Sequence, residues 1–591
     1  MPEVRSPPQE HSVSTVVETD VLIVGSGPAG ASAALALSTY GVPNLVVTRC
    51  ASLADTPRAH ITNQRTMEVL RDLGVEQDVI ARATPQHLMG DTTFCTSLAG
   101  EELGRVRSWG NDPLVQAAHD LASPTRMCDM PQHLMEPVLV DAAVARGTRL
   151  RFETAYLSHT QDTGGVTATV RDRLRGDTYE IRARYLIGAD GGRSKVAEDA
   201  GLPMGGRMGV AGSINIVFDA DLTRYTAHRP STLYWVLAPG ATVGGIGAGL
   251  VRCVRPWNEW LVVWGYDVTA GAPDLTTEYA ESVVRRLIGD DDVRVTIRSS
   301  SAWTVNEMYA ETYASGRVFC AGDATHRHPP SNGLGSNTSV QDSYNLAWKL
   351  KMVLDGTADA RLLDTYTAER APIGRQIVTR ANKSIGETAP IFEALDGLSP
   401  QTPEQLRANI AARKDATEAA EKQRARLREA IAFKVYEFNA HGVDLNQRYD
   451  SAAIVPDGTP DPGFTRDPEL HHQPSSRPGA KLPHTWITSG TRRLSTLDAV
   501  GRGRFTLLTG IGGDAWVRAA QAQEIDIATV VIGPGQEYED PYGDWARLSE
   551  VSDAGALLVR PDGYVAFRHA SAAPDAEALL TNALRRILGY S

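Results

Sequence analysis

The stretch VLIVGSGPAG, near the N-terminus, constrains the fold of this chain more than any other. An apolar run that suits a buried strand passes into three glycines with the spacing G-x-G-x-x-G. In such a setting Gly25 permits a tight turn, Gly27 lets the backbone approach a pyrophosphate, and Gly30 lets the following helix pack against the strand. The helix N-terminus then offers unpaired N–H groups and the positive end of its dipole to the phosphates. The sequence therefore predicts a dinucleotide-binding site here.

The residues after the glycines complete a βαβ unit but depart from its usual ending. A helix is predicted over 29–39 and a second strand over 44–48. Such a strand usually ends in an acidic residue that accepts a hydrogen bond from a ribose hydroxyl. Here Thr48 and Arg49 take that place. Since an arginine at this point can indicate the 2′-phosphate of NADP, these residues leave the identity of the dinucleotide open.

Two later stretches carry further dinucleotide motifs. In RYLIGADGGRSKV an apolar strand ends at Asp190. In GRVFCAGDATHRHPPSNGLGSNTSVQDSYNLAWKL a strand reaches Asp323, and a loop rich in Pro, Gly and Asn leads into a helix predicted from about Ser339. A carboxylate at the end of a strand, such as that of Asp323, can accept a hydrogen bond from a ribitol hydroxyl. The helix that follows Asn337 can aim its first amides at an electron-rich ring oxygen.

In this order, the three motifs resemble those of the class A FAD-dependent aromatic hydroxylases; NAD dehydrogenases lack the second and third. The stretches PRAHITNQRTMEVLRDLGV, PQHLMEPVL and RYDSAAIVPDG resemble the phenol hydroxylase branch, which includes the 2,4-dichlorophenol 6-monooxygenases. The resemblance covers almost the whole chain. It implies an α/β architecture with a Rossmann-like FAD-binding domain of the para-hydroxybenzoate hydroxylase type, a β-sheet substrate domain and a thioredoxin-like C-terminal domain.

Domain boundaries follow from this resemblance and from the local patterns. They are 18–200 and 300–390 for a discontinuous FAD-binding domain, 200–300 with about 90–125 for the substrate-binding domain, 391–470 for a helical middle segment and linker, and 475–591 for the thioredoxin-like domain. A single long charged helix, capped by Thr402, is predicted over 401–440. Arg560–Gly563 is predicted as a hairpin turn between apolar strands. No cysteine follows Cys320, so the last domain has no redox cysteines.

The family's chemistry is mostly that of its cofactor. The resemblance implies that NAD(P)H reduces FAD and that a flavin C4a-hydroperoxide, formed with O2, passes oxygen to an aromatic ring, usually ortho to a hydroxyl. The expected substrate is a simple or chlorinated phenol, or an aromatic intermediate of natural-product biosynthesis. The protein's own tasks are to bind the flavin, accept the phenol proton and exclude water.

Matches to the family assign candidate residues to the cofactor. These are Gly25, Gly27, Gly30, Arg49, Arg58, Gln132, Asp190, Asp323, Gly335, Ser336 and Asn337. Arg58 and Gln132 match positions that reach the pyrophosphate and ribitol, although each residue type is also common on protein surfaces. Gly335, Ser336 and Asn337 are expected near the pyrimidine oxygen of the flavin. Asp190 is expected to hold a turn near the pyrophosphate.

Candidates for catalysis and substrate binding are fewer. His60 matches a family aspartate that lies near the substrate hydroxyl, and its ordinary pKa suits a proton acceptor near neutral pH. The alternative is a histidine that only packs against the flavin. Pro330 is expected to turn its carbonyl toward the substrate pocket. Contacts to the substrate are predicted for Tyr234, Trp235 and Arg252, with sheet core as the alternative for the aromatic rings.

Composition restricts the classes of partner and metal that this chain is expected to bind. The net charge of −12 and the absence of a long basic run disfavour nucleic acid and anionic membranes. Five widely spaced cysteines without C-x-x-C disfavour disulfides and zinc, and the H-x-H of His326 and His328 lacks a third ligand, so no metal is predicted. A cytoplasmic homo-oligomer, dimer or higher, is expected. Same-fold alternatives are an epoxidase, a halogenase or a reductase, and another class is a non-catalytic flavin-binding scaffold.

Overall fold

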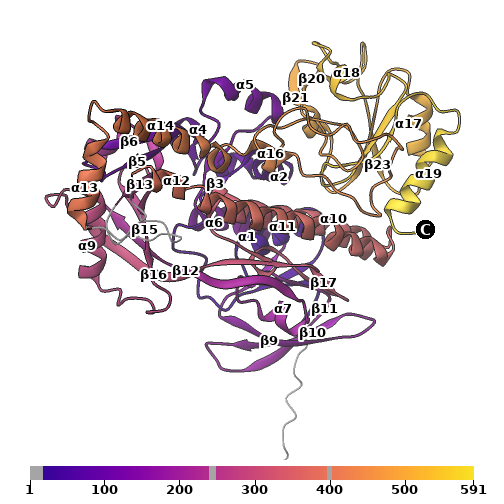
Figure 1. The fold of residues 1–591 in the computed structure, drawn as a ribbon. Helices are drawn as coiled ribbons and strands as arrows, with labels where there is room; N and C mark the ends of the chain where they lie inside the picture. Colours follow the sequence, from indigo (N-terminus) through magenta and orange to yellow (C-terminus); the bar gives the residue numbers. More distant parts are fainter. Residues whose placement is uncertain (1–16, 238–247, 396–401, 591) are drawn as a thin grey trace, which may run out of the picture.

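The computed structural model describes residues 17–237, 248–395 and 402–590. Two long helices, α10 (Gly335–Leu354) and α11 (Thr365–Gly386), cross the middle of the molecule (Figure 1). One large sheet lies below them, a second lies to the left, and the C-terminal domain lies at the upper right (Figure 1). Among the described residues, no helix is long and apolar enough to cross a membrane.

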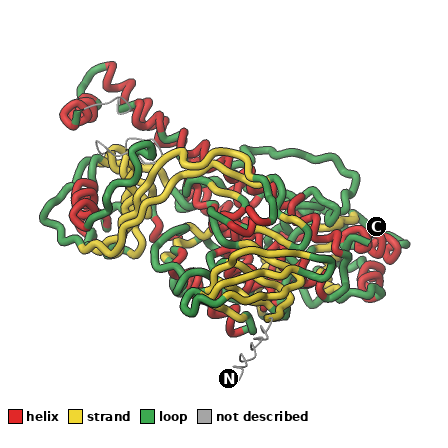
Figure 2. Tube along the Cα trace, turned by 90° about the horizontal axis from the view of Figure 1, so that it is seen from below, coloured by secondary structure: helices red, strands yellow, loops and turns green. Residues whose placement is uncertain are grey.

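The first sheet holds the predicted dinucleotide motifs. Its main path runs in the order β17 (Ala314–Ser315), β18 (Val318–Cys320), β11 (Thr178–Gly188), β1 (Val17–Val24), β2 (Asn44–Val47) and β8 (Arg149–Arg151), with β10 (Val166–Asp172) and β9 (Thr154–Gln161) branching from β11. The strands β18, β11, β1, β2 and β8 pair in parallel. This sheet lies on the side of the molecule that Figure 2 views from below. Apolar runs in β1 and β2 are buried because helices cover the sheet, as expected for parallel strands.

The strand register brings the motifs together. Val24 at the end of β1 pairs with Gly188 of β11, and Gly188 pairs with Cys320 of β18. The three loops that follow these strands therefore leave the sheet at the same edge. Helix α1 (Pro28–Thr39) packs against both α6 (Gln132–Ala145) and α10. This arrangement is the βαβ geometry that the glycine spacing predicts.

The second sheet is largely antiparallel and has eight strands. Their order is β19 (His326–Arg327), β16 (Thr296–Ala310), β12 (Met204–Asp219), β15 (Glu259–Tyr266), β14 (Ala248–Arg255), β13 (Ser231–Leu237), β5 (Asp91–Cys95) and β6 (Glu102–Arg107). One face packs against α9 (Thr277–Ile288), and the other packs toward α12 (Ala389–Glu393) and α14 (Glu418–Phe433). Strand β5 pairs in parallel with β13, so residues from 91 onward join this sheet.

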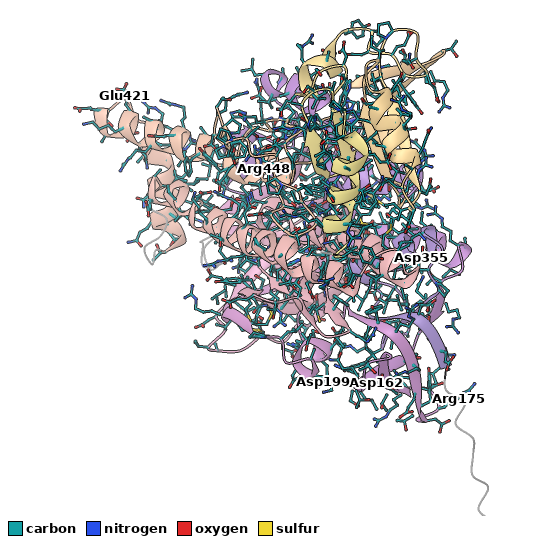
Figure 3. All side chains as sticks on the ribbon, turned by 90° about the vertical axis from the view of Figure 1, so that its right-hand side faces the viewer. Asp162, Arg175, Asp199, Asp355, Glu421 and Arg448 are labelled. Carbon is teal, nitrogen blue, oxygen red and sulfur yellow. The ribbon has the colours of Figure 1, made fainter. Side chains whose placement is uncertain are left out.

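Two helices differ from the sequence prediction. The expected single helix over 401–440 is wrong: α13 (Pro403–Ala412), α14 and α15 (Val435–Phe438) are separate. The break arises because the side chain of Thr417 caps α14 by accepting a hydrogen bond from the amide of Ala420. Figure 3 shows Glu421 of α14 at the outer end of this segment, far from Asp162 at the first sheet. The second difference is that α10 begins at Gly335, before the predicted Ser339.

The C-terminal domain has a four-stranded sheet in the order β23 (Ile527–Val531), β22 (Phe505–Thr509), β24 (Ala556–Val559) and β25 (Val565–His569). Only the β22–β23 pair is parallel, and α17 (Asp514–Gln521) packs beside α19 (Ala576–Ile587). This is the thioredoxin-like arrangement, and the hairpin at Arg560–Gly563 is confirmed. The guanidinium of Arg560 in that turn is fully buried and forms ion pairs with Glu369 of α11 and with Asp562.

Candidate active site

The predicted phosphate cradle lies at the shared edge of β1, β11 and β18. Gly25 has a φ of +106°, and a Cβ there would lie 2.2 Å from the carbonyl oxygen of Ala189. A Cβ on Gly30 would lie 2.0 Å from the carbonyl oxygen of Gly25. Gly27 differs, because the space beside it is open and its nearest neighbour is Glu136 Oε1, 3.9 Å from an added Cβ. The cradle therefore requires glycine where the backbones touch and leaves room where a pyrophosphate would lie, so these residues fit FAD.

The two acidic motif residues lie in different surroundings. The carboxylate of Asp190 accepts hydrogen bonds from Ser194 Oγ at 2.5 Å, Lys195 N at 2.8 Å and Val196 N at 3.1 Å. Asp190 thus accepts from the first two amides of the short helix α7 (Lys195–Asp199), whose N-cap is Ser194, and these bonds hold the turn. Asp323, by contrast, is exposed just after β18.

The remaining polar candidates lie on the segment after β2 and at the start of α6. Arg49 and Arg58 are exposed on the segment that follows β2. Gln132 opens α6 and donates a hydrogen bond from Nε2 to Glu136 Oε1 at 2.6 Å. The amide of Gln132 also donates to the carbonyl oxygen of Arg58 at 2.8 Å, so these two residues lie next to each other.

The first turn of α10 offers backbone amides. The first intrahelical bond of this turn runs from Thr338 N to Leu334 O at 2.9 Å, which leaves the amides of residues 335–337 outside the helical ladder. The side chain of Asn337 is occupied: Nδ2 donates to Ile61 O at 2.7 Å and to Gly333 O at 2.6 Å, and Oδ1 accepts from Asn63 N at 3.0 Å. Asn337 therefore fastens α10 to the short strand β3 (Ile61–Thr62) and to the adjacent Asn63.

A buried charged cluster follows directly from this strand. His60 Nδ1 lies 3.2 Å from Asp129 Oδ1, and Arg252 donates to Asp129 Oδ2 at 2.9 Å. His60 Nε2 is buried without a hydrogen-bond partner among the described residues. Because the carboxylate accepts at Nδ1, Nε2 is left as the unprotonated nitrogen. The structure thus joins two predicted residues, His60 and Arg252, through an aspartate.

The electrostatics of the cluster keep His60 neutral. Burial lowers the pKa of His60 to about 4, and the positive charge of Arg252 acts in the same direction. Burial would raise the pKa of Asp129, but the charge of Arg252 and the hydrogen bonds from His60 and Arg252 outweigh burial and lower it. The cluster therefore pairs a carboxylate with a guanidinium and leaves a neutral imidazole beside them.

Sequence reasoning missed Asp129. It lies in the two-residue strand β7 (Cys128–Asp129) and is 1 % exposed. The available signal was a lone acidic residue inside the apolar run MCDM. Such a residue needs partners when it is buried, and here the partners come from distant parts of the chain.

The predicted substrate contacts divide between the two faces of the second sheet. Trp235 packs in the same cluster as Ile61, Leu233 and Leu250, and the strand register places Arg252 opposite Leu233. Tyr234 points to the other face, because successive strand residues alternate. It is fully buried there near Trp260, and its hydroxyl donates to Arg229 O at 2.9 Å. The structure therefore makes Tyr234 a core residue on the face covered by α9.

The loop before α10 contains the other candidates. Pro330 is exposed, and His328 Nδ1 lies 2.7 Å from the carbonyl oxygen of Pro329. His326 is fully buried, and its Nε2 lies 2.9 Å from Asp342 Oδ2, which links it to the protein core. Across the described ranges, no group of three or more His, Cys, Asp or Glu side chains is arranged to hold a metal ion.

Comparisons with known proteins agree with this geometry. Residues 18–381 match the family described as FAD binding domain, and residues 475–591 match the family described as aromatic-ring hydroxylase, C-terminal. The chain is 56% identical to a 2,4-dichlorophenol 6-monooxygenase of Delftia acidovorans, covering 97% of this chain and 99% of the relative. It is 51% identical to a phenol 2-monooxygenase of Pseudomonas sp., covering 97% and 93%. A solved flavin-dependent monooxygenase, PieE, in complex with FAD and substrate, superposes with a TM-score of 0.93 at 46% identity, covering 97% of this chain and 100% of that one.

Proposed function

Because the chain belongs to the FAD-dependent aromatic hydroxylases of the phenol hydroxylase branch, we propose that it hydroxylates a simple or chlorinated phenol, with His60 as the acceptor of the phenol proton. NAD(P)H and O2 are the co-substrates. The chemistry that FAD supplies when bound is the transfer of electrons from NAD(P)H to O2 and the insertion of one oxygen atom into the ring. The observation that carries the proposal is the buried, unpartnered Nε2 of His60, backed by Asp129.

The cluster can activate a phenol in one step. The phenol hydroxyl donates to His60 Nε2, and transfer of the proton makes the ring more electron-rich at the ortho position. The carboxylate of Asp129 stabilises the imidazolium that forms, because it lies 3.2 Å from Nδ1. The charge of Arg252 lowers the pKa of His60, but the same charge stabilises the developing phenolate.

The surrounding residues have supporting roles in this proposal. Trp235 and the apolar side chains on its face hold the ring and exclude water, and the carbonyl of Pro330 lies at the pocket mouth. Gly25, Gly27 and Gly30 receive the pyrophosphate, with Arg58 and Gln132 at its side and Arg49 at the adenosine end. Asp323 accepts from the ribitol, Asp190 holds the adjacent turn, and the amides of residues 335–337 face the flavin's pyrimidine oxygen.

We propose a separate role for each domain. We infer that 18–200 and 300–390 bind FAD, that 200–300 with about 90–125 covers the substrate, that 391–470 connects, and that 475–591 serves assembly or stability. The five cysteines are free thiols, four of them buried, which fits a reducing cytoplasm. A homo-oligomer, dimer or higher, is proposed, with no nucleic-acid or membrane partner.

The test is phenol-stimulated oxidation of NAD(P)H by the purified yellow holoenzyme. A panel of phenols, chlorophenols and larger aromatic hydroxy compounds is assayed while the product mass is read in parallel. We expect stimulation by phenols together with a gain of one oxygen atom in the product. Oxidation of NAD(P)H that no hydroxylated aromatic stimulates would refute the proposal.

A further inference from the structure

Glu136 of α6 borders the phosphate cradle, and the proposed mechanism gives it no role. Its Oε1 is the nearest atom to the open space beside Gly27. Its Oε2 accepts a hydrogen bond from Ala54 N at 2.7 Å, and Oε1 accepts from Gln132 Nε2 at 2.6 Å. The residue is 3 % exposed. A buried carboxyl group therefore forms one wall of the space that the glycine spacing reserves for an anion.

The neighbours of Glu136 favour its charged form before a ligand arrives. On the segment after β2 they are the amide of Ala54 and the guanidinium of Arg58, and on α6 the side-chain amide of Gln132. Burial opposes these groups and raises the pKa of Glu136. The adjacent His133, whose pKa is lowered by burial, stays uncharged near neutral pH, and Asp55 acts on it from the same segment. Burial thus raises the pKa of the Glu136 carboxyl group, and Arg58 is a cation that opposes this rise.

A pyrophosphate beside Gly27 would add negative charge next to this carboxyl group. Two like charges in a partly desolvated site disfavour each other, and the weaker acid takes up a proton. The N-terminus of α1 and Arg58 attract both anions. The pyrophosphate stays ionised near neutral pH, so the carboxyl group is the group that takes up a proton. Protonation of Glu136 is therefore the way in which the site relieves the repulsion.

We propose that Glu136 takes up one proton when FAD enters the cradle, so that this chain binds FAD more tightly as the pH falls. The inference rests on the proposed assignment of Gly27 to the pyrophosphate. Bound FAD raises the proton affinity of Glu136, and by reciprocity a bound proton raises the affinity for FAD. Between the pKa values of the free and bound states, the Kd rises with pH by up to about tenfold per unit, which is the slope for one proton.

The experiment measures FAD release from the diluted holoenzyme by the fluorescence of free FAD, between pH 6 and pH 8.5, without phenol or NAD(P)H. For the wild type we expect a Kd that rises with pH. For Glu136→Gln, which keeps the shape and the hydrogen-bonding capacity, we expect a Kd that varies less than about twofold and lies at least about tenfold below the wild-type value at the highest pH. A Glu136→Gln variant that binds FAD more weakly than the wild type would show instead that the carboxylate holds the cofactor, and would overturn the proposal.

Two controls keep the result interpretable. Glu76→Gln changes another buried glutamate, which pairs with Arg71 away from the cradle, and it should retain the wild-type pH slope. Gly27→Ala should fold, because Gly27 has a φ of −67° and an added Cβ would lie 3.9 Å from Glu136 Oε1, its nearest neighbour outside the adjoining residues. The variant should nevertheless weaken FAD binding at least about tenfold if the pyrophosphate fills that space. Normal FAD binding by Gly27→Ala would refute the premise.

A direct measurement covers the case in which Glu136→Gln does not fold. Adding FAD to wild-type apoenzyme in weakly buffered solution with a pH indicator should show uptake of close to one proton per FAD near neutral pH. Uptake of none would overturn the proposal. None of these readouts depends on phenol turnover, so a failure here is distinct from a failure of the proposed hydroxylase activity.

Discussion

Replacing Asp129 by asparagine tests whether the tautomer of His60 matters, because the imidazole ring itself is kept. In the wild type the carboxylate accepts from Nδ1 at 3.2 Å and pairs with Arg252 at 2.9 Å. The asparagine could turn its NH2 group toward Nδ1, and the ring would then carry its proton on Nε2. In that tautomer Nε2 donates a hydrogen bond and cannot accept the phenol proton. The substitution therefore removes the base without removing the imidazole.

The size of the effect follows from general base catalysis, which contributes about 10²–10⁴-fold to a rate. We expect Asp129→Asn to lower the kcat for hydroxylation of a neutral phenol by that range. The variant also leaves the buried Arg252 without its partner carboxylate, which costs ~3–5 kcal/mol of stability. Assays therefore run well below the melting temperature of the variant, with FAD content and circular dichroism recorded first.

The assay compares two phenols at one pH. One is neutral, and the other carries electron-withdrawing substituents and is already ionised in solution. We expect the loss in kcat to be large for the neutral phenol and much smaller for the ionised one, because the latter needs no base. His60→Gln should show the same contrast. An equal loss for both phenols would refute the base role and leave a structural role for the cluster; no loss for either would refute the whole argument.

Three further predictions concern the base, the cradle and the domain contact. Because the pKa of His60 is lowered to about 4, the imidazole stays neutral above that pH, so the acid limb of the kcat/KM profile, measured from initial rates, should fall below about pH 5 rather than near the ordinary histidine value of about 6.5. Gly30→Ala should yield colourless protein, because its Cβ would lie 2.0 Å from Gly25 O; the flavin absorbance of the purified protein checks this. Arg560→Ala should lower the free energy of unfolding by ~3–5 kcal/mol in urea titrations, because it leaves the buried carboxylate of Asp562 without the guanidinium that pairs with it and leaves Glu369 with Lys349; an effect below about 1 kcal/mol, the size expected of a surface pair, would contradict the burial.

Local signals in the sequence predict most of the FAD site. The glycines at 25, 27 and 30 have roles that follow from backbone sterics alone, and each strand before a motif residue is visible as an apolar run. The sequence places the start of α10 too late because glycine, serine and asparagine are poor helix formers by themselves. A tertiary contact holds those residues in the helix: Asn337 donates a hydrogen bond to Ile61 O and accepts one from Asn63 N.

The substrate side depends on contacts that no local pattern reveals. Along the sequence, Asp129 is 69 residues from His60 and 123 residues from Arg252, although it contacts both. Substrate contacts are predicted for both Tyr234 and Trp235, yet neighbouring strand residues point to opposite faces, and the alternation alone does not say which face a helix covers. That choice follows from the position of α9, which covers one face and leaves the other toward β3.

The strand register that aligns Val24, Gly188 and Cys320 also determines how late in translation the FAD site can form. The walls of the cradle come from loops that follow these residues, and the amides of α10 come later still. A ribosome must therefore translate more than half of the chain before any complete site exists for the cofactor. The complete FAD site can therefore contribute binding free energy only to chains whose distant segments have already come together.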